Sequence, residues 1–291
     1  MEEKCEQVLW KNGEPTIPLY YRSFINNKEN DTLIIYFHGA ISGPSIDPRI
    51  FPYFNGISIA RETKNANFLL FSDPLLSLKE DILLTWYCSP YAEETISKKI
   101  AEIISSNANK YNIKKILLMG GSGAGIIISK VSQNLKGVYC FIWNCQTDIS
   151  KFEFAKGEQK RIWAEAVSYP DANISHNSIN ITSPQLYKNS NYYFILQLYD
   201  DWHHLEEHFT PLCLSLGESK NNINKNYSKN ILLNVLVHVG HWATKEQLSE
   251  RRSKHITISR EDQVNFLNDF ISSKEPEKDF NTVYFNKWNK T

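Results

Sequence analysis

A serine among small residues is the side chain in this sequence best placed for covalent chemistry. Ser122 lies in the segment Met-Gly-Gly-Ser-Gly-Ala-Gly, between the apolar run 116–119 and an apolar helical pattern. A serine on a sharp turn between a strand and a helix is typical of a nucleophile elbow, which needs small residues two before and two after it. Gly120 and Ala124 hold those positions, Ala124 where the strict pattern has glycine. The segment therefore predicts a nucleophilic serine.

Other interpretations of this glycine-rich turn fit less well. A dinucleotide-binding loop needs the spacing Gly-x-Gly-x-x-Gly, and here the last glycine comes one position early. A P-loop needs Lys-Ser or Lys-Thr after its last glycine, and this chain has Ile-Ile there. A tight strand-to-helix turn without chemistry remains the alternative, so the rest of the chain has to decide.

The order of acidic and basic residues further along the chain supports the catalytic interpretation. Proteins with a nucleophile elbow place the acid after a late strand and the histidine after the last one. Asp200 and Asp201 follow the apolar run 192–198, and we prefer Asp201 because its spacing suits the turn into the next helix. His241 follows a glycine after the apolar run 231–237. We therefore predict Ser122, Asp201 and His241 as a catalytic triad.

An acyl-transfer site also needs two backbone N–H groups that bind the developing oxyanion. The residue after the nucleophile, Gly123, is expected to supply one of them. The other is expected from Ala40 or Gly39, in the His-Gly loop that follows the apolar run 33–37. His38 either contacts the substrate or only shapes this loop.

A histidine cluster after Asp201 raises the alternative of a metal site. His204 and His208 are four residues apart and would share one face of a helix. Leu205 stands where an HExxH site has glutamate, and Pro211 favours a helix that begins again near that point. We predict no metal site, and we expect His204 and the neighbouring Trp202 to contact the substrate.

Predicted strands and helices alternate along the chain, and these elements must position the side chains named above. Nearly continuous apolar runs predict strands that are covered on both faces, as in a parallel sheet. These runs are 33–37, 68–71, 116–119, 138–143, 192–198 and 231–237. Helical patterns occupy 94–109, 125–134 and 263–271. We predict an α/β fold with a mostly parallel central sheet flanked by helices.

Three further segments complete the expected organisation. Residues 7–10 and 17–24 predict an antiparallel hairpin at the edge of the sheet. Residues 147–190 are polar and too long for a simple connection, which predicts an inserted cap or lid. Residues 220–230 predict a polar loop. No linker divides the chain, so we expect one domain over residues 1–291 with this single insertion.

Composition limits the class of partner. The 291 residues carry 32 basic and 32 acidic side chains, so zero net charge argues against nucleic acid held by bulk electrostatics. No apolar run reaches the roughly 18 residues of a membrane span, and the first residues lack a secretory pattern. The five cysteines are scattered without a CxxC pair, which disfavours disulfides and structural zinc. We expect a cytoplasmic protein without a transmembrane segment.

Several short motifs, taken in order, resemble those of a known family. The elbow 120–125, the Asn144-Cys-Gln146 segment after the next strand, the Asp-Asp-Trp-His-His-Leu run 200–205 and the final Gly-His pair appear in that order. They are similar to motifs of α/β-hydrolase-fold proteins from bacterial capsule loci, among them the capsular polysaccharide O-acetyltransferases of the serogroup A meningococcal type. The resemblance extends from about residue 33 to residue 242 and is close only at these motifs.

The resemblance implies both a fold and a reaction. The fold would be the α/β-hydrolase fold, with Asp201 as the acid and with Asn144 and Gln146 near the substrate. The reaction would be O-acetylation of a surface polysaccharide, with acetyl-CoA as co-substrate and no permanently bound cofactor. A membrane-bound capsule assembly complex would be nearby, and a homo-oligomer is compatible with the sequence. Two alternatives stay open: a carbohydrate esterase or general serine hydrolase, and a non-catalytic scaffold in polysaccharide biosynthesis or export.

Overall fold

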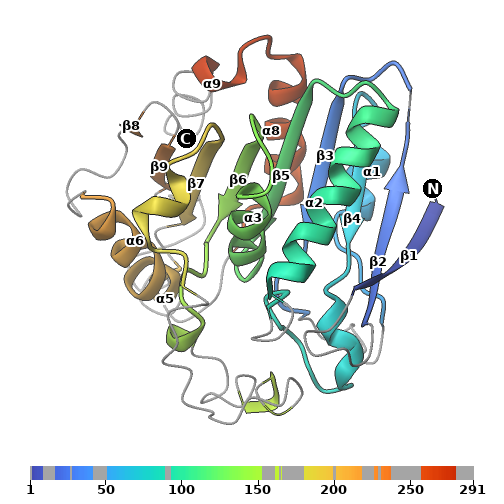
Figure 1. Cartoon of the computed structure of the whole chain (residues 1–291). Helices are drawn as coiled ribbons and strands as arrows, with labels where there is room; N and C mark the ends of the chain where they lie inside the picture. Colours follow the sequence, from blue (N-terminus) through green and yellow to red (C-terminus); the bar gives the residue numbers. More distant parts are fainter. Residues whose placement is uncertain are drawn as a thin grey trace.

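A nine-stranded sheet forms the centre of the protein in the computed structural model (Figure 1). The structure describes residues 2–8, 17–26, 28–41, 51–88, 93–152, 161–163, 165, 180–198, 201–217, 226–228, 231–236 and 257–279. The strand order is β1-β2-β4-β3-β5-β6-β7-β9-β8. Within the described ranges, no helix is long and apolar enough to cross a membrane.

The six apolar runs form six mutually parallel strands, which confirms the predicted parallel sheet. These strands are β3 (Thr32–Phe37), β4 (Asn67–Phe71), β5 (Lys115–Gly121), β6 (Tyr139–Trp143), β7 (Tyr192–Leu198) and β9 (Ile231–Leu236). Their carboxyl ends all point the same way. Side chains that follow neighbouring strands in the sequence are therefore brought to one edge of the sheet.

Antiparallel strands lie at both edges of the sheet. A hairpin is present as β1 (Glu2–Val8) and β2 (Ile17–Phe24), and β2 pairs with β4. The second strand has the predicted bounds, whereas the first begins five residues before the predicted 7–10. At the opposite edge, β8 (Asn226–Ser228) pairs with β9. The sequence predicted a loop there, and this was wrong. A short edge strand is held by backbone hydrogen bonds and needs no apolar alternation that a sequence pattern would reveal.

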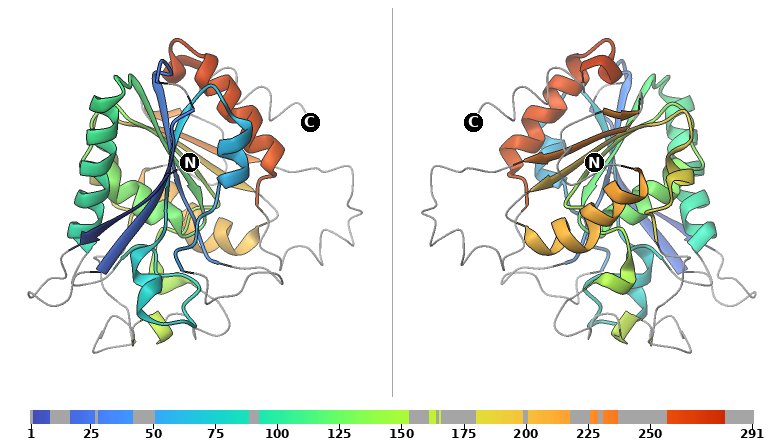
Figure 2. Two further views of the ribbon diagram at one scale, coloured as in Figure 1. Left: turned by 90° about the vertical axis from the view of Figure 1, so that its right-hand side faces the viewer. Right: turned by 90° about the vertical axis from the view of Figure 1, so that its left-hand side faces the viewer.

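Helices cover both faces of the sheet (Figure 2). Along β3, Leu33, Ile35 and Phe37 pack into one core cluster, while Ile34 and Tyr36 pack into the other. The first cluster lies under α2 (Glu93–Lys110) and α3 (Ala124–Ser132), and the second under α1 (Ile57–Glu62) and α8 (Arg260–Ser272). This alternation is the period-two pattern of a strand buried on both sides.

The predicted helices begin and end close to the expected residues because their sequences carry local signals. In α2, Ile96, Ile100, Ile103 and Ile104 are buried along one stripe. Before α8, Ser259 and Asp262 form a capping box, in which each side chain accepts the backbone N–H of the other residue. A short helix, α9 (Pro276–Asp279), follows. Short 3₁₀ turns occupy Pro74–Leu78, Ile149–Lys151 and Pro184–Tyr187.

The segment after β7 is one continuous helical run, contrary to the helix predicted to begin again near Pro211. It consists of α5 (Trp202–His204), a π-helical turn (Leu205–Phe209) and α6 (Thr210–Ser215). In the π turn the N–H of Thr210 donates to the carbonyl of Leu205, five residues earlier. The wider turn lets the backbone stay helical up to Pro211, whose missing N–H falls in the first turn of α6.

The segment predicted as an insertion packs onto the main core where the structure describes it. Phe152, Trp163, Ile181 and Tyr187 all belong to the core cluster under α2 and α3. A bridge between Asp148 and Asn180 joins the two ends of the segment. These contacts attach the base of residues 147–190 firmly. The lid function of the segment stays a prediction.

Candidate active site

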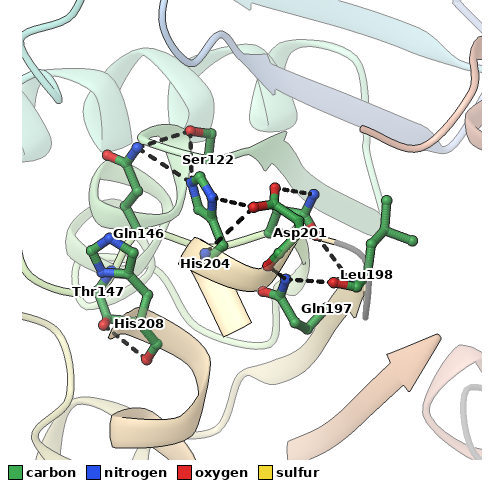
Figure 3. A network of polar contacts seen from close by, with 9 residues as sticks. Ser122, Gln146, Thr147, Gln197, Leu198, Asp201, His204 and His208 are labelled. Carbon is green, nitrogen blue, oxygen red and sulfur yellow. Dashed lines mark hydrogen bonds and ion pairs between the residues drawn. The ribbon is translucent and has the colours of Figure 1, made fainter. Parts of the chain in front are cut away.

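The carboxyl ends of five neighbouring strands, β4, β3, β5, β6 and β7, carry the polar residues of the candidate site. Ser122 follows β5, and Asn144 and Gln146 follow β6. Asp201 and His204 follow β7 (Figure 3). In an open parallel sheet this edge is where ligands bind, because loops from several strands meet there.

Ser122 has the backbone conformation of a nucleophile elbow. Its φ is +56°, in the left-handed region that a residue other than glycine seldom adopts. The turn is fixed because the Ser122 N–H donates to the carbonyl of Trp143, while the Ser122 carbonyl accepts from Gln146 and Gly125. A Cβ on Gly120 would lie 2.7 Å from the Cβ of Ala124. The two positions therefore have to be small, as the sequence pattern indicated.

The side chains of Ser122, His204 and Asp201 lie in a row (Figure 3). The Oγ of Ser122 is 3.4 Å from Nε2 of His204. Nδ1 of the same ring is 2.9 Å from Oδ1 of Asp201. Asp201 also caps α5, because Oδ1 accepts the backbone N–H of His204. A hydroxyl, an imidazole and a carboxylate in this order can pass the serine proton to the ring, which makes the oxygen a nucleophile.

His204 occupies this position, where the sequence predicted His241. His241 lies outside the described residues, so its predicted role is not tested. Sequence reasoning assigned His204 to the substrate because a base was expected only after the last strand. The signal that was present is the spacing Asp-x-x-His at a helix N-terminus. That spacing lets one carboxylate accept both the backbone N–H and the ring N–H of the histidine.

Asn144 holds Asp201 in this structure, and its expected contact with substrate stays a prediction. The residue is buried and also has a positive φ, of +45°. Its Nδ2 donates to Oδ2 of Asp201 at 3.1 Å, and its Oδ1 accepts the N–H of Leu198 at 2.9 Å. Both ends of the amide are therefore engaged inside the protein. Asn144 positions the carboxylate from the neighbouring strand.

Gln146 is buried but reaches the reactive atoms directly. Its Nε2 lies 3.0 Å from the Oγ of Ser122 and 3.4 Å from Nε2 of His204. Its Oε1 accepts the indole N–H of Trp86 at 2.5 Å. Gln146 therefore lies beside Ser122 and His204, and its expected contact with substrate stays a prediction.

The loop after β3 passes against the elbow, as expected for an oxyanion loop. A Cβ on Gly39 would lie 2.9 Å from the carbonyl oxygen of Gly121 and 3.3 Å from the Cβ of Ser122. Such a close approach requires glycine. Ala40 follows, half-buried against the main core. The structure thus brings Gly39 beside Ser122 and Gly123, and the oxyanion roles of Gly123, Gly39 and Ala40 stay predictions.

His38 shapes this loop through both ring nitrogens, and its alternative role as a substrate contact stays a prediction. The ring is buried, its Nδ1–H donates to the carbonyl of Gly39 at 2.7 Å, and its Nε2 accepts the N–H of Asp73 at 3.0 Å. These partners fix one neutral tautomer. Burial lowers the pKa of His38 to about 4, so the ring stays uncharged at neutral pH.

Asp73, after β4, is a structural centre that the sequence did not predict. Its carboxylate is fully buried and accepts hydrogen bonds from the N–H groups of Leu75 and Tyr87 and from the hydroxyl of Thr85. Burial raises the pKa of Asp73 to about 6, although these hydrogen bonds oppose the shift. The contacts hold Trp86 and Tyr87, both at a φ of +55°. An Asp-Pro pair directly after a strand was the available signal.

The remaining side chains of the histidine cluster, His203 and His208, lie against the ring of His204, and Trp202 belongs to the same short helix. His208 is buried, its Nδ1 accepts the N–H of Thr147, and burial lowers its pKa well below the usual value. The described part of the chain contains no group of three or more histidine, cysteine or acidic side chains that would hold a metal ion. Trp202 is 53% exposed. Its predicted contact with substrate stays a prediction.

Similar solved structures identify the fold. The capsule O-acetyltransferase of Neisseria meningitidis serogroup A, in complex with caged gadolinium, matches with a TM-score of 0.52 and 16% identity, over 90% of this chain and 98% of that chain. A mutant of the same enzyme in complex with CoA matches with a TM-score of 0.51 and 16% identity, over 88% of this chain and 91% of that chain. The acylaminoacyl peptidase of Pyrococcus horikoshii matches with a TM-score of 0.52 and 11% identity, over 94% of this chain and 41% of that chain. The chain has the α/β-hydrolase fold. The sequence matches no protein-family model and no curated protein.

The α/β-hydrolase fold explains why these residues meet, and at such low identities the likeness concerns the fold alone. A protein from a glycosylation-associated complex of Streptococcus agalactiae also matches, with a TM-score of 0.47 and 12% identity, over 80% of this chain and 41% of that chain. This chain therefore spans about two fifths of that relative and of the Pyrococcus peptidase. In the α/β-hydrolase fold, the strand–serine–helix turn exposes the serine at the carboxyl edge of the sheet. Ser122 lies at that point.

Proposed function

We propose that this protein is a serine-dependent acyl-transfer enzyme in which Ser122 is the nucleophile. The observation that carries the proposal is the row of contacts from Ser122 to His204 to Asp201, at a strained elbow. A backbone held at a positive φ and a buried carboxylate behind an imidazole are features that a purely structural turn does not need. Their combination supports covalent catalysis.

The reaction follows from the positions of the groups. His204 takes the proton of Ser122 while the serine oxygen forms a bond to the acyl carbonyl carbon. Asp201 keeps the proton on Nδ1 and stabilises the charged ring. The N–H groups of Gly123 and Ala40 bind the oxyanion. His204 then gives its proton to the leaving group, and an acyl-enzyme remains. An acceptor hydroxyl then loses its proton to the same ring and bonds to the acyl carbon; the bond from that carbon to Ser122 Oγ breaks, and His204 returns the proton to Oγ.

For the acyl donor and acceptor, we propose acetyl-CoA and a hydroxyl of a surface polysaccharide. The likeness to the meningococcal capsule O-acetyltransferase, one structure of which is in complex with CoA, supports this choice together with the shared motifs. The exposed indole of Trp202, next to Asp201, offers an apolar surface for a sugar ring. The place of action would be the cytoplasm, beside the assembly of the polysaccharide. With water as acceptor, the same site is an esterase.

The decisive experiment separates these outcomes. Purified protein is incubated with acetyl-CoA, with and without candidate polysaccharides, and the sugar product and free CoA are measured by mass spectrometry. A transferase acetylates the sugar, whereas an esterase releases acetate without it. Ser122→Ala is expected to remove either activity together with labelling by a fluorophosphonate probe. Full activity of folded Ser122→Ala would overturn the proposal. Ser150→Ala, on a half-buried serine in the turn after β6, serves as the control.

A further inference from the structure

The orientation of the Gln146 side chain is determined by its partners. The indole N–H of Trp86 can only donate a hydrogen bond, so the atom of the Gln146 amide that faces it must be the carbonyl oxygen. The amide nitrogen then faces Ser122, at 3.0 Å from its Oγ. Trp86 is itself fully buried, with its ring edge-on against Phe152 and Trp163. The amide therefore cannot turn over without losing a buried hydrogen bond.

This orientation also determines the direction of the hydrogen bond made by the serine. The amide nitrogen of Gln146 is a donor only, so the Oγ of Ser122 accepts from it. The serine proton is then left for another acceptor, and Nε2 of His204 lies 3.4 Å away. That nitrogen carries the lone pair of the ring, because Nδ1 carries the ring proton toward Asp201, and the amide nitrogen of Gln146 also lies 3.4 Å from it. All hydrogen bonds in the row run in one direction, from Trp86 to Asp201.

We propose that Gln146 is a positioning residue that directs the hydroxyl proton of Ser122 toward His204. This inference rests on the proposed function, since it assigns Gln146 a task in the step that activates the serine. Through Trp86, the position of Gln146 also depends on a residue that follows a distant strand. Asp73, after β4, fixes Tyr87 and Thr85, and these residues flank Trp86 on both sides. A buried carboxylate outside the reaction centre thereby helps to hold the loop that carries Trp86.

The test replaces the donor by an acceptor of the same shape. In Gln146→Glu, the carboxylate still accepts from Trp86 but also accepts the Ser122 proton, so the hydroxyl turns away from His204. We expect kcat for acyl transfer to fall about 100-fold while KM changes less than about threefold. The added negative charge beside the ring favours its protonated form. The acid limb of the pH–rate profile should therefore move to higher pH.

A second variant and a control keep the result unambiguous. Gln146→Met keeps the length of the side chain without polar atoms. It should lower kcat about 10-fold and leave the acid limb in place. Gln185→Glu makes the same chemical change on an exposed glutamine far along the chain and should match the wild type.

Each outcome decides a separate point. Wild-type kcat and pH profile in folded Gln146→Glu would overturn the inference, while inactive Ser122→Ala would still support the proposed function. If Gln146→Glu fails to fold, as judged by thermal unfolding, the Met variant decides, and wild-type kcat there overturns the inference. Full activity of Ser122→Ala would instead remove the function on which the inference rests.

Discussion

Two buried aspartates, Asp73 after β4 and Asp201 after β7, begin helical turns at the same edge of the sheet. Each accepts a backbone N–H of its own turn, from Leu75 in one case and from His204 in the other. Each also accepts a hydrogen bond from a residue outside that turn, Asp73 from Thr85 and Asp201 from Asn144. By local geometry the two carboxylates are near equivalents.

They differ in one partner. The side-chain donor to Oδ2 of Asp73 is a hydroxyl, whereas Oδ1 of Asp201 faces an imidazole whose other nitrogen reaches Ser122. A hydroxyl or backbone N–H keeps its proton at neutral pH, but an imidazole exchanges it. A buried aspartate cap therefore becomes part of a reaction centre when the group that donates to it also contacts a reactive side chain. Burial and capping alone leave it structural.

Asp201→Asn is expected to reduce catalytic activity most, which tests the difference between the two aspartates. An amide has one acceptor fewer, so either His204 or Asn144 faces an NH₂ group, and the ring loses the partner that fixes its tautomer. We expect kcat/KM to fall about 10³- to 10⁴-fold with the fold retained. Acyl transfer and circular dichroism measure the two effects. Near wild-type activity would mean that Asp201 is a cap of the same kind as Asp73.

Replacement of the histidines is expected to cause the next largest loss of activity, and it identifies the ring that serves as the base. His204→Ala should reduce acyl transfer about 1000-fold, because no other described side chain lies between Ser122 and Asp201. His241→Ala is the matched variant, and His203→Ala, on the neighbouring ring, is the control. An active His204→Ala protein and an inactive His241→Ala protein would place the base after the last strand, as the sequence suggested.

The pH dependence of the unfolding free energy should also distinguish the wild type from a variant of Asp73. The folded pKa of His38, about 4, lies below its ordinary value of 6.5, so its contribution to stability is lost as pH falls from about 6.5 to 4. The folded pKa of Asp73, about 6, lies above its ordinary value of 3.8, so its contribution increases as pH falls from about 6 to 3.8. The two effects oppose each other. In Asp73→Asn the opposing effect of Asp73 is absent, while the effects of His38 and of the buried His208 remain.

Between pH 7 and pH 4, Asp73→Asn is expected to lose about 2 kcal/mol more unfolding free energy than the wild type, because it lacks the opposing contribution of Asp73. Urea unfolding at several pH values measures it. Asp148→Asn, on a half-buried aspartate that also caps a turn, provides the control and should follow the wild type. Equal pH dependence in wild type and Asp73→Asn would contradict the assignment.

The smallest effect is that of Asp73→Asn at neutral pH. One backbone N–H loses its acceptor, while a buried negative charge disappears, so the protein should be less stable by about 1 kcal/mol. Acyl transfer should stay within about threefold of the wild type, since no reacting atom touches Asp73. Thermal unfolding and kcat/KM measured on the same sample test both statements. A loss of activity as large as in Asp201→Asn would remove the distinction between the two aspartates.

The sequence predicted the parts of this molecule that local patterns determine. The six parallel strands follow from continuous apolar runs, and the turn at Ser122 follows from the small residues that the elbow requires. Which polar side chains meet depends on distances that no local pattern contains. His38 and Asn144 follow strands just as Ser122 does, yet both turn inward to hydrogen-bond partners far along the chain. The Asp-x-x-His spacing was visible in the sequence, but the place of the His204 ring between Ser122 and Asp201 is seen only in the structure.

The site residues are attached to strands in the interior of the sheet. Strands β3, β5, β6 and β7 each have a parallel neighbour on both sides, whereas β1 and β8 form the edges. Backbone amides of such central strands open only with the whole fold, and edge strands open at a much lower free energy. The amides of β5 and β6 should therefore be among the slowest to exchange with deuterium. Opening of the N-terminal hairpin should leave the alignment of Ser122 and its partners unchanged.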